Sequence, residues 1–251
     1  MSTIFDLTGK VAIVTGANTG IGQAIALSLA AAGADIAAVG RTPAEETVEK
    51  VRALGRKAEI VSADLSSIEP VQRVVDETIA KLGGLDILIN NAGIIRRADS
   101  VDFTEEDWDA VIDTNLKSTF FLAQAAGRHM LAQGSGKIVN IASLLSFQGG
   151  IRVPSYTASK SGVAGLTKLL ANEWAARGVN VNAIAPGYIA TNNTAALQAD
   201  ETRNRQIQER IPAGRWGDPS DIGGAAMFLA SPAANYIHGH ILAVDGGWLA
   251  R

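Results

Sequence analysis

The chain of 251 residues carries 22 Lys and Arg against 25 Asp and Glu, a formal net charge of −3, which makes it a poor partner for nucleic acid or an anionic membrane. With 47% hydrophobic and 19% charged residues it can bury a sizeable core, and its lack of cysteine excludes disulfides, thiolate metal sites and a cysteine nucleophile. Its start shows no secretory signal and no apolar run reaches about 18 residues, so we expect a cytoplasmic protein.

Short apolar runs alternate with longer segments of helical spacing along most of the chain. The short runs are rich in Val and Ile and nearly continuous, as expected for strands that are covered on both faces. We predict strands at residues 11–15, 36–39, 58–62, 85–90, 137–142, 179–185 and 241–244. The segments between them predict helices at residues 22–32, 45–54, 69–82, 105–132, 156–177 and 221–230.

This repeated order of strand, helix and strand predicts an α/β fold. We expect a single Rossmann-like domain over residues 1–251, with a doubly wound parallel sheet of about seven strands and helices on both faces. One long stretch, residues 188–217, has no predicted element. A segment of this length in a compact fold is more often functional than a simple connection, so we interpret residues 188–217 as a substrate lid.

The first predicted strand runs directly into a glycine-rich turn that opens the first helix. Glycines let the backbone turn tightly and approach a pyrophosphate, while the helix N-terminus offers unpaired N–H groups and a partial positive charge. A plain strand–helix turn can also contain glycines, but a strand before and a helix after are the context that a dinucleotide site needs. The predicted contacts in this turn are Gly16, Asn18, Thr19, Gly20, Ile21 and Gly22.

The end of the second predicted strand bears on the choice of coenzyme. In dinucleotide-binding folds an acidic residue here binds the ribose 2′-hydroxyl, whereas an arginine accommodates a 2′-phosphate. This chain has Gly40 and Arg41 and no acid, which favours NADP(H); Arg41 could equally be an ordinary exposed arginine, and NAD(H) is the alternative. Asp64, after the third strand, is placed either to meet the adenine or to cap the following turn.

Three residues suggest a catalytic group. Tyr156 and Lys160 stand four apart in a predicted helix, so both side chains lie on one face. A phenol has a pKa of about 10, and a neighbouring ammonium lowers it, which makes Tyr156 a candidate general acid and base. Ser143 ends the fifth strand, at the sheet edge that borders the ligand crevice. Each residue alone has an ordinary structural reading, but together, downstream of a dinucleotide loop, they predict catalysis.

With these motifs the chain resembles the short-chain dehydrogenase/reductase family over nearly its whole length. The family pattern T-G-x-x-x-G-x-G stands at residues 15–22, N-N-A-G at 90–93, Y-x-x-x-K at 156–160 and D-G-G at 245–247. The resemblance implies an NAD(P)-dependent oxidoreductase acting on CH–OH groups, in which the nicotinamide supplies the hydride chemistry and the protein supplies position and one proton.

The resemblance also implies individual roles. Tyr156 would exchange the proton with the substrate oxygen, and Lys160 would lower its pKa and bind the ribose. Ser143 would orient the substrate oxygen, and Asn115 would support a water relay to Lys160. The further cofactor contacts that it implies are Arg41, Asp64, Leu65, Asn91, Ala92, Gly93, Pro186, Gly187, Ile189 and Thr191, besides Tyr156 and Lys160.

The chain departs from the family's NADP(H) pattern at one position. Thr19 stands where many such members carry a basic residue, so Arg41 is left alone and NAD(H) stays open. Members of the family are commonly tetramers, which implies a homotetramer with the predicted helices 105–132 and 156–177 in the subunit contacts.

Other segments resemble family members that act on sugar acids, in uronate breakdown: residues 93–97, 146–155, 190–194 and 211–217. Such a substrate needs a carboxylate anchor, and arginine binds carboxylates bidentately. Arg96, Arg97 and Arg152 follow strand ends on the crevice side, although each could instead be a surface or subunit-contact residue. The candidate substrate residues are Arg96, Ser143, Gln148, Arg152, Asn192 and Asn193, with Arg97 as a further possible anchor.

Other functions compete with sugar-acid oxidation. A 3-oxoacyl carrier-protein reductase or a general carbonyl reductase would share the same motifs, but no basic docking patch for an acidic carrier is evident. A non-catalytic dinucleotide-sensing regulator would not need the intact set of Asn115, Ser143, Tyr156 and Lys160. His238 and His240 lack a nearby acidic partner, so we predict no metal site there.

Overall fold

Seven parallel strands form one sheet in the order β3-β2-β1-β4-β5-β6-β7 in the computed structural model, which describes residues 4–251. Every neighbouring pair is parallel, so each connection crosses over the sheet. The strands are β1 (Val11–Thr15), β2 (Asp35–Gly40), β3 (Ala58–Ser62), β4 (Ile87–Asn90), β5 (Gly136–Ile141), β6 (Val179–Pro186) and β7 (Ile241–Val244). The predicted doubly wound sheet is confirmed.

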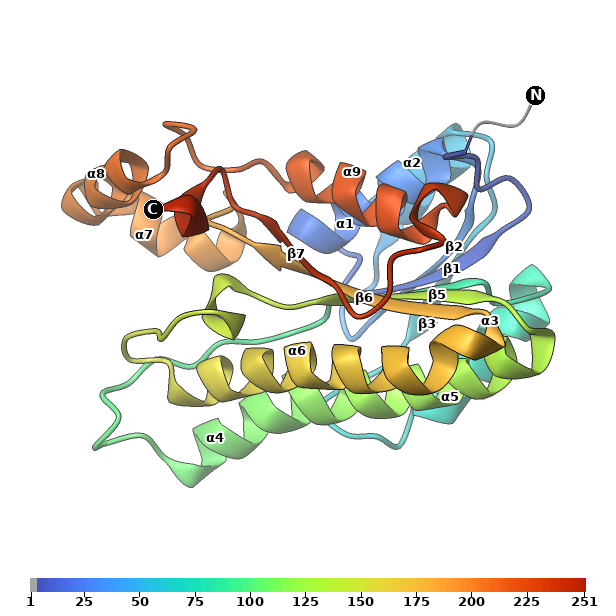
Figure 1. The fold of residues 1–251 in the computed structure, drawn as a ribbon, viewed down its shortest axis with the longest axis horizontal. Helices are drawn as coiled ribbons and strands as arrows, with labels where there is room; N and C mark the ends of the chain where they lie inside the picture. Colours follow the sequence, from blue (N-terminus) through green and yellow to red (C-terminus); the bar gives the residue numbers. More distant parts are fainter. Residues whose placement is uncertain (1–3) are drawn as a thin grey trace.

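Helices cover both faces of this sheet (Figure 1). On one face lie α1 (Gly20–Ala31), α2 (Glu45–Ala53) and α9 (Pro219–Ala230); on the other lie α3 (Val71–Leu82), α5 (Ser118–Gln133) and α6 (Pro154–Trp174). The strands are apolar on both sides because each side has its own core. Val14 and Ile36 pack toward the first layer, and Ile13 and Leu88 toward the second.

The long helix predicted at 105–132 is not continuous. The structure has α4 (Glu105–Ile112), then a π-helical turn (Asp113–Lys117), then α5. The π-turn contains Asn115, whose side chain is buried and bonded to the backbone of Ile94. Such wide turns are rare and occur mostly at functional sites, and a hydrophobic periodicity does not reveal them. The prediction of one regular helix is wrong at residues 113–117.

The 188–217 segment contains more structure than its sequence pattern indicated. It holds a 3₁₀ turn (Asn192–Thr194), α7 (Ala195–Ala199) and α8 (Glu201–Arg210). Helix α8 shows no periodic spacing of apolar residues, because Ile207 is its one buried residue. The two ends of the segment are joined by a short parallel bridge, in which Gly217 N donates to Tyr188 O at 2.8 Å and Ala190 N donates to Gly217 O at 2.8 Å.

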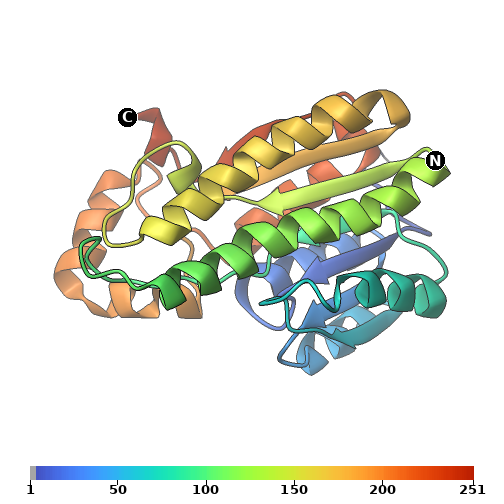
Figure 2. The ribbon, with the colours of Figure 1, turned by 90° about the horizontal axis from the view of Figure 1, so that it is seen from below.

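Because all strands are parallel, the loops that follow them meet at one edge of the sheet. The glycine-rich turn follows β1, Asn91 follows β4, and Ser143 follows β5. Helices α7 and α8 and the C-terminus lie at this same end of the molecule (Figures 1 and 2). The remaining short helices are Leu144–Ser146, Ala175–Arg177, Pro232–Ala234 and Trp248–Ala250. Within residues 4–251, no helix has both the length and the apolar character needed to cross a membrane.

Candidate active site

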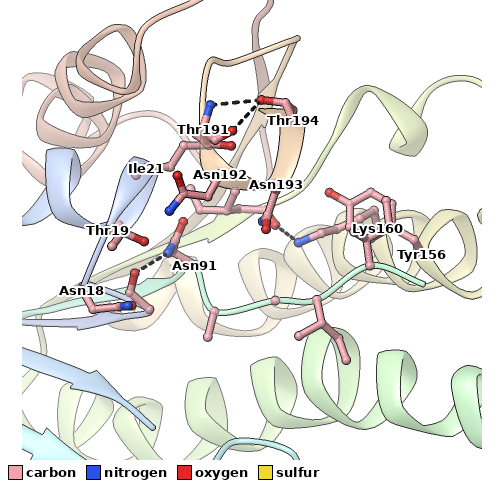
Figure 3. A pocket seen from close by; sticks show the side chains of 18 of the residues that line it. Asn18, Thr19, Ile21, Asn91, Tyr156, Lys160, Thr191, Asn192, Asn193 and Thr194 are labelled. Carbon is pink, nitrogen blue, oxygen red and sulfur yellow. Dashed lines mark hydrogen bonds between the residues drawn. The ribbon is translucent and has the colours of Figure 1, made fainter. Parts of the chain in front are cut away.

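A cleft of about 540 Å³ runs along the carboxyl ends of the strands, from the glycine-rich turn to Tyr156 and Lys160 (Figure 3). Many of the predicted residues line it: Gly16, Asn18, Thr19, Gly20, Ile21, Gly22, Arg41, Asn91, Ala92, Gly93, Tyr156, Lys160, Thr191, Asn192 and Asn193. Arg97 lines it too, together with Ile94, Ile95, Ile141 and Thr194, which the sequence analysis did not select. The fold therefore brings residues from both halves of the chain into one cavity.

The glycine-rich turn has the shape of a cradle for a phosphate group. Gly16 has a φ of +64°, and a Cβ on Gly22 would lie 2.1 Å from the Gly16 carbonyl oxygen, so neither position accepts a side chain without rearrangement. Helix α1 begins here, and within residues 4–251 its Thr19 side chain makes no capping hydrogen bond. The backbone N–H groups at this end thus suit an anion, and the residues present fit the pyrophosphate of a dinucleotide.

Asn91 holds this turn in place. Its Nδ2 donates to the carbonyl oxygens of Thr15 at 2.9 Å and Gly16 at 3.3 Å. The Thr15 hydroxyl in turn accepts from the backbone N–H groups of Asn91 and Ala92, each at 2.9 Å. The end of β4 is therefore fastened to the end of β1, and this network fixes the floor of the cleft.

Arg41 lies at the outer end of the cleft and is 81% exposed. Its Nη1 lies 3.9 Å from Oδ2 of Asp64. The other oxygen of Asp64 accepts from Ser66 N at 2.9 Å, and this backbone hydrogen bond lowers the pKa of the carboxyl. Asp64 therefore caps the turn that follows it, which was one of its two predicted roles. The Leu65 side chain is buried in the core and lies outside the lining of the cleft.

Tyr156 and Lys160 lie at the inner end of the cleft, one turn apart on α6 (Figure 3). The Lys160 ammonium is buried and donates to Ile141 O at 2.6 Å, and it lies 5.7 Å from the centre of the Tyr156 ring. Burial lowers the pKa of Lys160 to about 8 and raises that of Tyr156. The expected lowering of the Tyr156 pKa by Lys160 is therefore not found, because burial of the phenol raises its pKa more than its neighbours lower it.

Asn115 lies beside the lysine. Its Oδ1 accepts from Ile94 N and its Nδ2 donates to Ile94 O, both at 2.8 Å. A Cβ on Gly93 would lie 3.2 Å from the Asn115 Oδ1 and 3.8 Å from the Lys160 Nζ, so both side chains approach this glycine. The π-turn thus places the Asn115 amide and the buried ammonium around the same glycine.

Ser143 and Arg97 both act on Tyr156. Hydrogen bonding to Ser143 and the positive charge of Arg97 lower the pKa of the phenol, against the larger opposite effect of burial. The Ser143 hydroxyl also accepts from Leu145 N at 3.2 Å, which fixes the loop after β5. The predicted group of serine, tyrosine and lysine is thus assembled in one place.

The structure separates the three candidate arginines. Arg97 lines the cleft, whereas Arg96 pairs with Asp107 at 3.1 Å and Arg152 pairs with Asp99 at 2.9 Å, and neither of these two is among the lining residues. Seven other predicted residues also lie outside the lining of the cleft, namely Asp64, Asn115, Ser143, Gln148, Pro186, Gly187 and Ile189. Gly187 instead allows close packing, since a Cβ there would lie 2.6 Å from the Asp245 Cα.

Thr194 was missed by the sequence analysis although it shapes the cleft. Its hydroxyl accepts from Thr191 N at 3.0 Å, as part of a capping box of the Asn192–Thr194 turn, and donates to Ile189 O at 2.7 Å (Figure 3). The spacing of two threonines three residues apart was the available signal. The turn holds Asn192 and Asn193 between the glycine-rich loop and Tyr156.

Comparison with known proteins agrees with this geometry. A family model described as Enoyl-(Acyl carrier protein) reductase matches residues 16–249. The 2-dehydro-3-deoxy-D-gluconate 5-dehydrogenase of Escherichia coli (strain K12) is 59% identical over 248 residues, which are 98% of this chain and 98% of that protein. The chain belongs to the short-chain dehydrogenase/reductase family. The predicted enzyme class, an NAD(P)-dependent oxidoreductase, is thereby confirmed.

Solved structures of short-chain dehydrogenases are also similar. A structure from Agrobacterium tumefaciens, assigned as a 2-deoxy-D-gluconate 3-dehydrogenase with bound NADP, is 62% identical with a TM-score of 0.94, covering 99% of this chain and 100% of that one. The gluconate 5-dehydrogenase of Burkholderia cenocepacia J2315, in complex with NADP and tartrate, is 40% identical with a TM-score of 0.93, covering 98% of both chains. The fold of this short-chain dehydrogenase/reductase is therefore that of its relatives throughout.

Proposed function

We propose that this protein is an NADP(H)-dependent dehydrogenase that interconverts a hydroxyl and a ketone on a sugar acid. The proposed substrate is 2-dehydro-3-deoxy-D-gluconate, reacting at its 5-hydroxyl, with 2-deoxy-D-gluconate reacting at its 3-hydroxyl as the related candidate, in the breakdown of uronates. The names of the relatives at 59% and 62% identity support this substrate class.

The observation that carries the proposal is the position of Arg97. Its charge acts on the Tyr156 phenol, so the guanidinium lies near the reacting position. Among residues 4–251 no acidic side chain forms an ion pair with Arg97, in contrast to Arg96 and Arg152. An exposed guanidinium without an acidic partner, in a cleft, is suited to bind a carboxylate with two parallel hydrogen bonds. A sugar acid would supply that carboxylate, while an ordinary ketone would not.

The proposed mechanism assigns one proton to the protein. When bound, the nicotinamide coenzyme accepts or donates the hydride. In the oxidation Tyr156 takes the proton from the substrate hydroxyl, and in the reduction it returns a proton to the carbonyl oxygen; such groups contribute about 10²–10⁴-fold to the rate. Ser143 donates a hydrogen bond to the same oxygen. Lys160, whose pKa burial lowers to about 8, can exchange a proton near that pH, and Asn115 holds the backbone of Ile94, which lines the same cleft.

Residues 188–217 are the proposed lid. They bring Thr191, Asn192 and Asn193 into the cleft opposite the catalytic group, where the two amides can bind the hydroxyls of the substrate. Arg41 is the proposed partner of the 2′-phosphate, and the NADP in related structures supports this assignment. NAD(H) is the alternative, since no second basic residue stands in the glycine-rich turn.

We further propose a cytoplasmic homotetramer in which α4, α5 and α6 make subunit contacts. Helices α5 and α6 lie side by side on one outer face (Figures 1 and 2), and Leu169 on α6 is 46% exposed. Light scattering on the purified protein would measure the assembly directly, and a monomer would contradict it.

A turnover screen tests the function. The purified protein is mixed with NADP⁺ or NAD⁺ and a series of hexonates and keto-deoxy sugar acids, and the nicotinamide absorbance is followed. The matched controls are neutral sugars of the same size and a 3-oxoacyl thioester with NADPH. We expect turnover of sugar acids in preference to both controls. Preference for the thioester would favour an acyl carrier-protein reductase, and indifference to the carboxylate would favour a general carbonyl reductase.

A further inference from the structure

A small apolar cluster lies outside the two cores that cover the sheet. Its buried members are Leu144, Ile207, Ile211 and Trp248, with Tyr188, Leu197, Trp216 and Leu249 packed around them. They come from three parts of the chain: the loop after Ser143, the lid, and the C-terminal turn. Figures 1 and 2 both show the C-terminus beside the lid helices. The cluster therefore connects elements that are far apart in sequence at the rim of the cleft.

The C-terminal turn is bonded to the far end of the lid. Ala213 N donates to Gly246 O at 3.0 Å, and Arg251 Nε donates to Arg210 O at 3.1 Å. The Arg210 guanidinium lies 4.0 Å from the centre of the Trp248 ring, a cation–π contact. A Cβ on Gly246, which has a φ of +64°, would lie 2.8 Å from Ile211 Cγ2. The approach of the two segments thus depends on this glycine.

The other side of Trp248 reaches the loop that carries Ser143. Its Nε1 donates to Gln148 Oε1 at 3.4 Å, and its ring is buried against Leu144, the residue after Ser143. The Tyr188 ring, at the neck of the lid, lies 4.7 Å from the Trp248 ring. One side chain therefore contacts the lid, the lid neck and the catalytic loop.

At its neck the lid rests on a cavity of about 230 Å³. The cavity is lined by Tyr188, Ile189, Ala213, Arg215, Gly217, Asp221, Val244, Asp245 and Gly246. This cavity separates part of the neck from the end of β7, whereas the neck itself is held by the Ile189–Gly217 bridge and by burial of Ile189 in the core. The outer part of the lid, helices α7 and α8, lies beyond this neck, and the contacts that reach it there include those of the C-terminal turn.

We propose that the C-terminal turn, residues 246–251, latches the lid over the cleft, with Trp248 as the positioning residue that joins α8 to the loop of Ser143. Loss of the Trp248 ring releases the lid and shifts Asn192, Asn193 and Ser143 relative to one another. The KM for substrate then rises and kcat falls, while the glycine-rich turn still binds the coenzyme.

Limited trypsin digestion with NADPH present tests the latch without any need for turnover. The exposed Arg203 and Arg205 on α8 are the cleavage sites to follow, by mass spectrometry. The test variant is Trp248→Leu, the conservative variant is Trp248→Phe, and the matched control is Trp174→Leu, a buried tryptophan of the core at the end of α6 that is remote from Tyr156. Cleavage follows the population of the open lid when opening is fast.

We expect Trp248→Leu to raise the cleavage rate and the KM by about 5–30-fold, a change typical of losing one or two contacts, with the dissociation constant of NADPH nearly unchanged. In Trp248→Phe the cleavage rate and the KM should stay close to their wild-type values. In Trp174→Leu neither quantity should change. Unchanged cleavage in Trp248→Leu, or an equal rise in Trp174→Leu, would overturn the latch. If Trp248→Leu does not fold, Arg210→Gln removes the cation–π contact at the surface and must still raise cleavage at Arg203 and Arg205.

The KM measurement rests on the proposed function, whereas the digestion does not. A wild-type protein that turns over no sugar acid would refute the substrate and leave the digestion to decide the latch.

Discussion

The guanidinium of Arg97 and the phenol of Tyr156 face the same cleft, and the charge of Arg97 lowers the pKa of Tyr156 while burial raises it more strongly. Arg97 lies in the loop after β4, and Tyr156 lies on α6. The residue that we propose to bind the substrate carboxylate therefore also acts on the residue that we propose to transfer the proton. On this proposal, one electrostatic interaction connects substrate recognition with acid–base chemistry.

Replacing Tyr156 with Phe tests the proton transfer. The ring remains and fills the same volume, but the hydroxyl that carries the proton is lost. We expect kcat to fall about 10²–10⁴-fold. The dissociation constant of NADPH, measured by fluorescence, should stay close to that of the wild type. Near-normal turnover in this variant would exclude the assigned role.

The pH dependence of the oxidation tests the effect of Arg97 on Tyr156. Because the positive charge lowers the pKa of the phenol, Arg97→Met should raise that pKa further. The rising limb of kcat/KM against pH, measured with a neutral hydroxy substrate, should move to higher pH. Arg152→Met serves as the control, since Arg152 pairs with Asp99 outside the cleft lining and should leave the profile in place.

Carboxylate recognition predicts a difference between substrates. A charge-assisted hydrogen bond contributes about 1.5–3 kcal/mol, so Arg97→Ala should lower kcat/KM for sugar acids about 10–150-fold. A neutral ketone of similar size never uses this contact, so its kcat/KM should fall far less. Arg96→Ala and Arg152→Ala are matched controls. Equal losses on acidic and neutral substrates would mean that Arg97 is structural, and full activity in all three variants would remove the physical support for a sugar acid.

Coenzyme preference depends on Arg41. Substituting Asp places a carboxylate where the 2′-phosphate is expected, repelling it while offering an acceptor to the ribose hydroxyl of NAD(H). The ratio of kcat/KM for NADP⁺ to that for NAD⁺ should therefore fall in Arg41→Asp. A wild-type protein that already prefers NAD⁺ would contradict the assignment of NADP(H).

Two lysines, the buried Lys160 and the half-buried Lys137, affect stability at alkaline pH. Burial lowers the pKa of Lys137 and of Lys160 to about 8, from 10.5. Between these values the unfolded chain holds protons that the folded chain has released, so the free energy of unfolding rises with pH, by at most about 1.4 kcal/mol per pH unit for each lysine. The effect of Lys137 should be well below this limit, because its ammonium is partly in water.

Lys137→Met separates the two contributions, since Lys137 lies at the start of β5, far from the cleft, and donates to Asn180 and Asn235. Urea unfolding at about pH 8 and about pH 9.5 should show a smaller rise in the variant than in the wild type. An equal rise in both would mean that the Lys137 pKa is not lowered in the folded state.

Local patterns in the chain predicted much of the fold and of the coenzyme end. Continuous Val and Ile runs predicted the seven strands because a strand covered on both faces needs apolar residues at every position. The glycine-rich turn and the i, i+4 pair of Tyr156 and Lys160 are likewise short-range features, whose geometry follows from a few adjacent residues. The structure brings both to the same cleft.

From the sequence alone Arg96 and Arg152 were selected as substrate residues and Arg97 only as a further possible anchor, and the tertiary structure reversed this order. Arg96 and Arg152 find acidic partners in Asp107 and Asp99, so Arg97 is the one directed to the cleft. The π-turn around Asn115, the pKa of Tyr156 and the contacts of Trp248 were decided in the same way. Each depends on which distant segments lie nearby and how much water they exclude. These are properties of the packed chain, so they cannot be predicted from a local pattern of residues.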